Sequence, residues 1–180
     1  MQPARRHELI DGEPYISDIL NFEHQYSCGK VCSALHKWSD QSKLGVSCFA
    51  PGVIFDSHNE VAPDAVWISY ERLAARALDN AGHLRVCPEL VVEVLSPGSR
   101  NEQRDRETKL SLYSRRGASE YWIIDWMRRG VTVYRRENTA LQLVATLRDS
   151  EDLTSPALLP GFACRVAGLF FLPPVNLERR

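Results

Sequence analysis

The most apolar run of the chain is Glu89-Leu90-Val91-Val92-Glu93-Val94-Leu95, and it ends at the turn-forming residues Ser96-Pro97-Gly98-Ser99. Branched side chains favour an extended backbone. A continuous apolar run, without alternation, is typical of a strand that is buried on both faces of a sheet. We therefore expect a central strand here, and the glutamate in its middle needs an explanation.

The segments before and after this strand alternate between expected strands and expected helices, which predicts a mixed sheet flanked by helices. Residues 101–116 suit a helix and residues 121–125 a strand, so that strand, helix and strand form one crossover unit. Near the start, Asp11-Gly12 favours a tight hairpin turn between two short extended pieces. Asn21 suits the cap of a helix whose apolar residues recur at three- or four-residue steps to about Trp38. Further strands are expected within 45–56, split by Pro51-Gly52, and at 65–68, 131–134 and 141–147, with a second helix at about 70–78.

The length and composition fit one folded unit. The chain has 180 residues, of which 44% are hydrophobic and 25% charged, as in an ordinary globular domain. The sequence shows neither an internal repeat nor a linker. We expect a single domain over residues 1–180, with a core at about 7–136 and C-terminal strands and a tail at 137–180.

The sequence also bears on the compartment. It has no apolar run of about 20 residues that could cross a bilayer, and its N-terminus lacks the apolar centre of a secretory signal. Its five cysteines are odd in number and irregular in spacing, which argues against a disulfide framework. We therefore expect a cytoplasmic protein that does not contact a membrane.

The charge is unevenly distributed along the chain. Residues 100–136 hold ten Arg or Lys and five Asp or Glu, a local net charge of +5, whereas the whole chain carries −1. A basic segment could bind the phosphates of a nucleic acid even though the rest of the chain is acidic, because the local electrostatic potential, rather than the net charge, attracts a polyanion. A solvated helix face and hairpin with mixed charges would have the same composition.

Glu93 is the most informative residue, because an ionised carboxylate inside an apolar strand is costly to bury without a partner. A second acid, Asp64, follows Pro63 and precedes the short apolar run at 65–68. If the two strands are neighbours, both carboxylates can bind one divalent ion, and Mg²⁺ or Mn²⁺ suits such oxygen ligands. A partly wet Glu93 paired with an arginine is the simpler alternative.

Several segments, taken in order, resemble a known family. They are Pro63-Asp64, the run from Pro88 to Pro97, Lys109 with Tyr113, and Glu120-Tyr121-Trp122-Ile123-Ile124-Asp125. As an ordered set they are similar to the Uma-type restriction endonucleases, a branch of the PD-(D/E)XK nuclease superfamily. The resemblance extends from the opening at 8–13 to about residue 134.

The resemblance implies an α/β (α+β) restriction-endonuclease-like fold, in which helices flank a mixed β-sheet, with an N-terminal β-hairpin and a long helix. It also implies a divalent metal, a DNA substrate and hydrolysis of phosphodiester bonds. Asp64 matches the aspartate of the PD element, and Glu93 matches the acid of the (D/E)XK element. Both are therefore expected to be catalytic metal ligands.

The sequence departs from the superfamily pattern at Leu95, where the lysine of the second element would stand. In this branch the lysine role moves to the next helix, and Lys109 is the only lysine after Lys43. On that helix Arg106, Lys109 and Tyr113 are expected one above another at three- and four-residue spacing. We expect Lys109 to point at the metal and act as the displaced catalytic lysine; a solvated surface lysine is the alternative.

Two residues are candidates for supporting roles. Glu8 could supply a third acid, as an N-terminal glutamate does in many of these nucleases, or it could lie on the hairpin surface. His24 begins a series with Cys28, Cys32 and His36 at four-residue intervals. That series is too long for one four-ligand zinc site, since it spans about 18 Å of helix. Either the pair His24 and Cys28 or the pair Cys32 and His36 could bind a metal with outside ligands. We expect Cys28 and Cys32 in the core and His24 near the site.

The turn after the central strand and the following helix supply candidates for DNA contact. Ser96 and Ser99 could hold a phosphate through backbone N–H groups at the start of the helix. An ordinary strand-to-helix turn would have the same sequence. Arg100, Arg104 and Arg106 follow in the basic segment and complete the set.

Two other functions stay open. One is a nuclease-fold module without catalysis, kept for DNA binding or self-association, which the missing lysine at position 95 favours. The other is a non-nuclease scaffold in which Asp64 and Glu93 are only ion-paired, which the acidic balance outside residues 100–136 favours. The partners expected are DNA and a second copy of the chain, because cutting both strands commonly needs two active sites related by two-fold symmetry.

Overall fold

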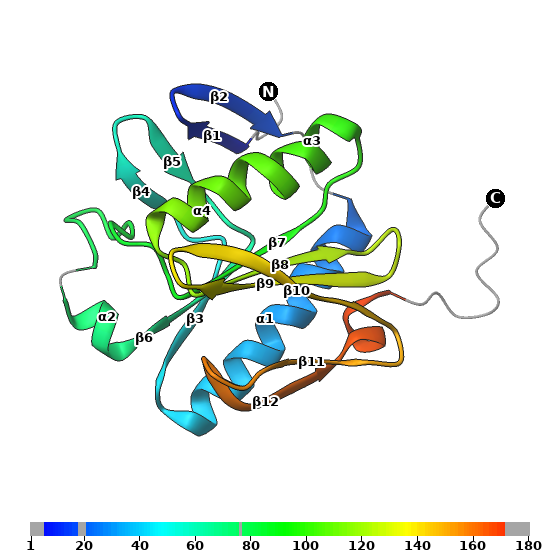
Figure 1. Ribbon diagram of the computed structural model, residues 1–180. Coiled ribbons are helices and arrows are strands. Elements are labelled where there is room, and N and C mark those ends of the chain that lie inside the picture. Colours follow the sequence, from blue (N-terminus) through cyan, green and yellow to red (C-terminus); the bar gives the residue numbers. More distant parts are fainter. Residues whose placement is uncertain (1–5, 18–20, 76, 172–180) are drawn as a thin grey trace.

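The computed structural model describes residues 6–17, 21–75 and 77–171. Its centre is a six-stranded sheet in the order β10-β9-β8-β7-β6-β3 (Figure 1). The apolar run forms β7 (Leu90–Val94), which lies between β6 (Ala65–Ser69) and β8 (Glu120–Asp125). β7 and β8 are parallel, and the other neighbouring pairs are antiparallel. The mixed sheet that the sequence predicted is therefore confirmed.

The remaining strands complete three sheets. The central sheet also contains β3 (Gly45–Phe49), β9 (Gly130–Glu137) and β10 (Ala140–Arg148). A four-stranded sheet has the order β2-β1-β5-β4 and consists of β1 (Arg6–Ile10), β2 (Glu13–Ser17), β4 (Val53–Asp56) and β5 (Asn59–Val61). A third sheet pairs β11 (Asp152–Ser155) with β12 (Leu159–Arg165). The expected hairpin turn is present, since Asp11 and Gly12 have φ of 52° and 82°, as a type I′ turn requires.

Helices flank the central sheet, and Figure 1 shows the two main ones on opposite faces. The long helix α1 (Phe22–Ser42) starts at Asn21, whose side chain accepts a hydrogen bond from the His24 N–H. On the other face, α3 (Ser99–Gln103), a π-helical turn (Arg104–Lys109) and α4 (Leu110–Arg116) follow one another without a break. A short α2 (Tyr70–Ala74) follows β6, and a 3₁₀ turn (Val166–Leu169) follows β12. No helix in the described ranges is both long and apolar enough to cross a membrane.

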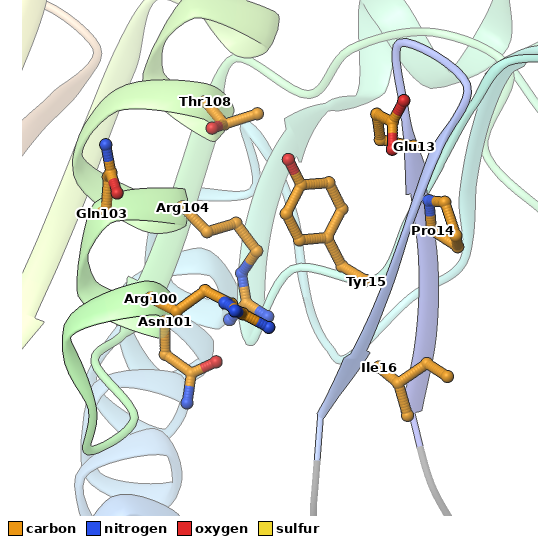
Figure 2. Close-up of a pocket in the computed structure, with 9 residues that line it drawn as sticks. All are labelled: Glu13, Pro14, Tyr15, Ile16, Arg100, Asn101, Gln103, Arg104 and Thr108. Atoms are coloured by element: carbon orange, nitrogen blue, oxygen red, sulfur yellow. The ribbon is translucent and has the colours of Figure 1, made fainter.

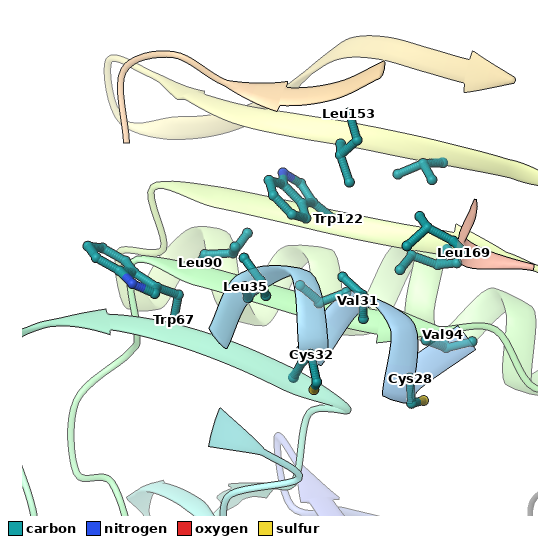
Figure 3. Packing of buried hydrophobic residues seen from close by; sticks show 14 of the residues in the cluster. Cys28, Val31, Cys32, Leu35, Trp67, Leu90, Val94, Trp122, Leu153 and Leu169 are labelled. Atoms are coloured by element: carbon teal, nitrogen blue, oxygen red, sulfur yellow. The ribbon is translucent and has the colours of Figure 1, made fainter. Parts of the chain in front are cut away.

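The core is divided by the sheet. One cluster packs α1 against the sheet and the C-terminal segment, and it includes Leu35, Trp122, Leu153 and Leu169 (Figure 3). The other lies on the α4 side. Because side chains alternate along a strand, Val92 and Val94 of β7 face the first cluster and Val91 faces the second. Glu93 therefore faces the helix formed by residues 99–116.

Some expectations need correction. The helix expected at about 70–78 ends at Ala74, because the chain turns back and Leu78 bridges to Leu84. Asp79 stabilises that return by accepting hydrogen bonds from the N–H groups of Ala81 and His83. The helix expected at 101–116 contains a π-helical turn, and the short strands β5, β11 and β12 were not individually expected.

Candidate active site

Asp64 and Glu93 meet at one end of the β6–β7 pair. The two strands are antiparallel with Ala65 opposite Val92, so the register sets Asp64 opposite Glu93. Residues directly opposite each other in such a pair present their side chains on the same face. Both are buried, with 4% and 2% of their surfaces exposed. The structure thus brings together the two acids that the sequence selected.

Lys109 lies between two of the candidate acids. Its Nζ is 2.9 Å from Glu93 Oε1 and 2.9 Å from Glu8 Oε1, and it is 1% exposed. It is the last residue of the π-helical turn, a deviation from regular helix that often accompanies functional sites. Lys109 therefore faces the two acids rather than solvent.

Glu8 is part of the same cluster rather than of the hairpin surface. It is 4% exposed and accepts a 2.9 Å hydrogen bond from the Ala62 N–H in addition to its contact with Lys109. Its strand, β1, belongs to the four-stranded sheet. The site therefore assembles side chains from both of the larger sheets and from the helix above them.

Arg6 is a member of the site that the sequence reasoning missed. Its Nη1 donates a 2.8 Å hydrogen bond to Asp64 Oδ1, and its Nη2 lies 3.7 Å from Glu8 Oε1. The signal was its position two residues before Glu8 on a strand, which places both side chains on one face. Arg6, Glu8, Asp64, Glu93 and Lys109 are hereafter called the charged cluster.

Tyr113 and Asp105 border the charged cluster from the helix. The Tyr113 hydroxyl donates a 2.9 Å hydrogen bond to Glu93 Oε1, the oxygen that also contacts Lys109. Asp105 Oδ1 lies 3.8 Å from Lys109 Nζ. Arg106 does not stack above Lys109 and Tyr113 as expected, because its guanidinium binds Glu102 and Asp125 instead. The π-helical turn alters the spacing on which that expectation rested.

His24 approaches Asp64 from the first turn of α1. Its Nε2 lies 2.8 Å from the Val94 carbonyl oxygen and 3.6 Å from Asp64 Oδ2. Since a carbonyl only accepts, Nε2 carries the proton, and Nδ1 faces the Cys28 thiol at 3.5 Å. Asp64 Oδ2 also accepts a 2.8 Å hydrogen bond from the Val94 N–H. His24 therefore lies near the site, as expected, and helps to fix one end of the Asp64 carboxylate.

The protonation of the acids follows from their surroundings. Burial alone would raise the pKa of Asp64, but hydrogen bonding to His24 and the charge of Arg6 hold that pKa below its usual range. At Glu8, burial alone would raise the pKa, but the positive charges of Lys109 and Arg6 outweigh burial, so the pKa of Glu8 is lowered. For Glu93, burial outweighs the attraction of Lys109, and neighbouring carboxylates add repulsion, so its pKa rises to about 7.

The donor set fits a hard divalent ion. Carboxylate oxygens are the ligands that Mg²⁺ and Mn²⁺ prefer, and Asp64 and Glu93 offer them from facing positions. Burial, with added repulsion from nearby carboxylates, raises the pKa of Glu93, and a bound cation would relieve that repulsion. His24, Cys28 and Asp64 also have potential ligand atoms within 4.8 Å of one another. Burial, however, raises the pKa of the Cys28 thiol well above its usual range, which disfavours the thiolate that metals bind.

The residues expected to contact DNA lie in different settings. Ser96 is buried at the end of β7, whereas Ser99 and Arg100 are exposed at the start of α3. Arg104 is buried, binds Asp105 and donates a 2.9 Å hydrogen bond to Ser17 Oγ. Of the three arginines in this set, Arg100 alone makes no side-chain hydrogen bond or ion pair within the described part of the chain.

One solved structure shares this fold across most of both chains. It is described as a "putative nuclease belonging to DUF820" from Anabaena variabilis, with a TM-score of 0.71 and 15% sequence identity over 91% of this chain and 89% of that chain. The expected restriction-endonuclease-like fold is thereby confirmed. No curated protein matches the sequence.

The family comparison covers more of the chain than the segments quoted above. The matching family model is Uma2, described as "Putative restriction endonuclease", and it matches residues 1–167. That range includes all five residues of the charged cluster, together with Tyr113 and His24. The chain belongs to the Uma2 family.

Proposed function

We propose that this protein is a divalent-metal-dependent endodeoxyribonuclease that hydrolyses DNA phosphodiester bonds. Family membership supports a nuclease, and one observation carries the finer proposal. Asp64 and Glu93 stand opposite each other on neighbouring strands, and Lys109 contacts Glu93 at 2.9 Å. Two carboxylates and an ammonium in one buried place form a set that suits metal-assisted hydrolysis.

The roles of the side chains follow from their contacts. A Mg²⁺ or Mn²⁺ ion bound by Asp64 and Glu93 would polarise a phosphate and lower the pKa of a bound water. Lys109 keeps its proton, because burial is outweighed by Glu8 and Glu93, which raise its pKa. Its ammonium can stabilise charge that develops on the phosphate. Glu8 holds Lys109 in place through the other side of the ammonium.

The remaining members orient the ligands. Arg6 and the Val94 N–H bind the two oxygens of Asp64, which fixes the plane of that carboxylate. Tyr113 and Lys109 bind the same oxygen of Glu93, Oε1. Glu93 Oε2 makes no hydrogen bond to any of the described residues, so it is available as a metal ligand. The proposed DNA contacts are Ser96, Ser99, Arg100, Arg104 and Arg106. Arg100 has the strongest case, because it is exposed and its guanidinium has no partner among the residues that the structure describes.

A nicking assay on supercoiled plasmid tests the proposal. The wild-type protein should convert the plasmid to open circles with Mg²⁺ or Mn²⁺ and not with EDTA. Asp64→Ala and Glu93→Gln should abolish the reaction. Glu89→Gln is the matched control, because Glu89 flanks the same strand at its other end and binds Ser69 and Arg72. Cleavage by Asp64→Ala at the wild-type rate would refute the proposal.

Calorimetry with Mn²⁺ tests the ligand assignment apart from cleavage. Glu93→Gln should bind Mn²⁺ much more weakly than the wild type, because a neutral amide replaces one of two anionic ligands. Glu89→Gln should bind as the wild type does. Equal affinity in Glu93→Gln and the wild type would remove Glu93 from the ligand set.

A module that binds DNA or itself without cutting is the second candidate function. Leu95 favours it, because the lysine of the superfamily element is missing there. The position of Lys109 against Glu93 favours catalysis instead. Plasmid binding by the wild type that is never followed by cleavage, with any divalent ion, would support the second candidate.

We further propose that residues 1–180 act as one domain in the cytoplasm and that two copies form a homodimer on DNA. The C-terminal Leu153 and Leu169 pack in the same cluster as α1, which supports a single unit. The five cysteines are free thiols, which suits a reducing compartment. Light scattering on the protein alone and with duplex DNA would measure the number of copies, and a single copy in both states would refute the dimer.

A further inference from the structure

A polar pocket of about 620 Å³ lies between the N-terminal hairpin and the helix above the site (Figure 2). The hairpin contributes Glu13, Pro14, Tyr15 and Ile16, and the helix contributes Arg100, Asn101, Gln103, Arg104 and Thr108. Its volume is within the roughly 300–1,000 Å³ that is usual for small-molecule sites. The charged cluster does not line it, so the mechanism proposed above leaves this pocket without a function.

The pocket is directly adjacent to the charged cluster. Tyr15 on β2 is the cross-strand partner of Glu8 on β1, so both side chains lie on the same face of the hairpin. On the helix side, Thr108 precedes Lys109, and the Arg104 guanidinium binds Asp105, which lies 3.8 Å from Lys109. A group seated in the pocket is therefore next to the proposed point of cleavage.

The lining residues combine an aromatic ring with two arginines. Figure 2 shows Tyr15 pointing from the hairpin toward the helix, and Arg100 and Arg104 pointing from the helix toward the hairpin. Arg104 is already paired with Asp105. Arg100 is exposed, and no partner for its guanidinium exists within the described ranges. A tyrosine ring can stack on a base of any sequence, and a guanidinium is suited to bind phosphate.

We propose that this pocket holds one unpaired nucleotide of the DNA substrate, with its base against Tyr15 and its phosphate on Arg100. The proposal rests on the nuclease function proposed above and specifies its substrate: DNA in which a nucleotide beside the cleaved bond is single-stranded or turned out of the helix. Extruding a base from intact duplex costs a few kcal/mol, and least where the base is already unpaired. The protein should therefore prefer single-stranded or mispaired DNA to a perfect duplex.

Binding measurements in EDTA test this independently of cleavage. The probes are a short single-stranded oligodeoxynucleotide that carries a fluorescent adenine analogue, the same strand in a duplex, and free deoxyadenosine monophosphate. Tyr15→Leu and Arg100→Gln should each weaken binding of the single strand about tenfold, as loss of one stacked base or one phosphate contact does. Tyr15→Phe should bind as the wild type does, because it keeps the ring.

Matched controls keep the result interpretable. Tyr70→Leu removes an exposed tyrosine from α2, and Arg85→Gln removes an exposed arginine from the loop before β7; neither residue lines the pocket. Both should bind the single strand as tightly as the wild type. Thermal melting should show that Tyr15→Leu remains folded, since leucine preserves the apolar packing of Tyr15 against the core.

The outcomes separate this proposal from the nuclease function. Weaker binding of the single strand by Tyr15→Leu, with a protein that cuts no DNA, supports the pocket and refutes the nuclease. Unchanged binding by Tyr15→Leu, with normal plasmid nicking, refutes the pocket and leaves the nuclease standing. Binding of the duplex as tight as that of the single strand, or binding of the free nucleotide alone, also overturns the pocket proposal.

Discussion

At the scale of single residues, Lys109 shows how a charged side chain can be placed in the interior. Its burial opposes the charge, but Glu8 and Glu93 stand at 2.9 Å on either side and hold its pKa above the usual value. The sequence identified Lys109 by elimination and by resemblance, because it is the last lysine of the chain. Its contact with Glu8 could not be foreseen, since it joins the π-helical turn to the distant strand β1.

Replacing Lys109 should damage both catalysis and stability. Lys109→Met leaves Glu8 and Glu93 buried without their shared cation, and breaking such a pair costs about 3–5 kcal/mol. Plasmid nicking should fall by roughly 10² to 10³. Urea unfolding measures the first effect and the nicking assay the second.

Two variants separate these effects. Lys109→Arg keeps the charge but not the compact geometry, so it should recover more stability than activity. Lys30→Met, at an exposed position of α1, should alter neither. Wild-type stability and nicking in Lys109→Met would show that this lysine is not part of the working site.

The cysteines should differ sharply in reactivity. Burial raises the pKa of the Cys87 thiol to about 12, so at neutral pH it stays protonated, and Cys28 and Cys32 are also buried. Cys48 is exposed. A thiol reagent followed by mass spectrometry should modify Cys48 first in the native protein and reach the buried three only after denaturation. Fast modification of Cys87 in the folded protein would contradict this packing.

At the scale of elements, the regular and strongly patterned segments were the predictable ones. The apolar run at 89–95 predicted β7, and Asp11-Gly12 predicted the hairpin. Strand propensity determines the first and turn-forming residues the second, and both are local properties of the sequence. β5, β11 and β12 carry no such pattern, although β5 pairs with the neighbouring β4 and β11 pairs with β12. The π-helical turn at 104–109 was not predicted either, because helix propensity does not distinguish a π-helical turn from regular α-helix.

The N-cap of α1 offers a clean test of local stabilisation. The Asn21 side chain accepts a 2.9 Å hydrogen bond from the His24 N–H, and losing such a cap costs about 0.5–2 kcal/mol. Asn21→Ala should lower the urea midpoint accordingly. Asn80→Ala, an exposed asparagine in the loop after α2, should leave the midpoint unchanged. Equal midpoints for the two variants would mean that the cap contributes nothing.

At the scale of the whole molecule, stability should be highest in the middle of the central sheet. β7 and β8 are buried along their entire lengths and are paired on both sides. β10 lies at the sheet edge and exposes Leu143 and Val144. Core strands open only with global unfolding, whereas edges open locally.

Hydrogen exchange followed by mass spectrometry would measure this gradient. Peptides from residues 90–94 and 120–125 should exchange most slowly, and peptides from β10 and from the β1–β2 hairpin should exchange earlier. Faster exchange in β7 than in β10 would contradict the expectation that stability is highest in the middle of the central sheet. The same experiment with Mn²⁺ should slow exchange near Asp64 and Glu93.

The sequence predicted the fold more completely than the site. Glu93 could be chosen because an acid within an apolar strand is unusual. Asp64 could be chosen because it precedes a second apolar run and matches the family's PD element, and the two strands are neighbours. Arg6 was missed because an arginine in a surface hairpin is ordinary until its partners are known. The pocket beside Tyr15 depends on how the hairpin and the helix are placed relative to each other, which local sequence does not determine.

The long separation between the members of the charged cluster affects when the site can form during synthesis. Glu8 and Arg6 leave the ribosome early, whereas their partner Lys109 follows after a large part of the chain has been made. At roughly 5–20 residues per second, that interval lasts several seconds. A nascent chain therefore lacks Lys109 during this interval. On the function proposed above, an unfinished copy of the protein should not cut nearby DNA.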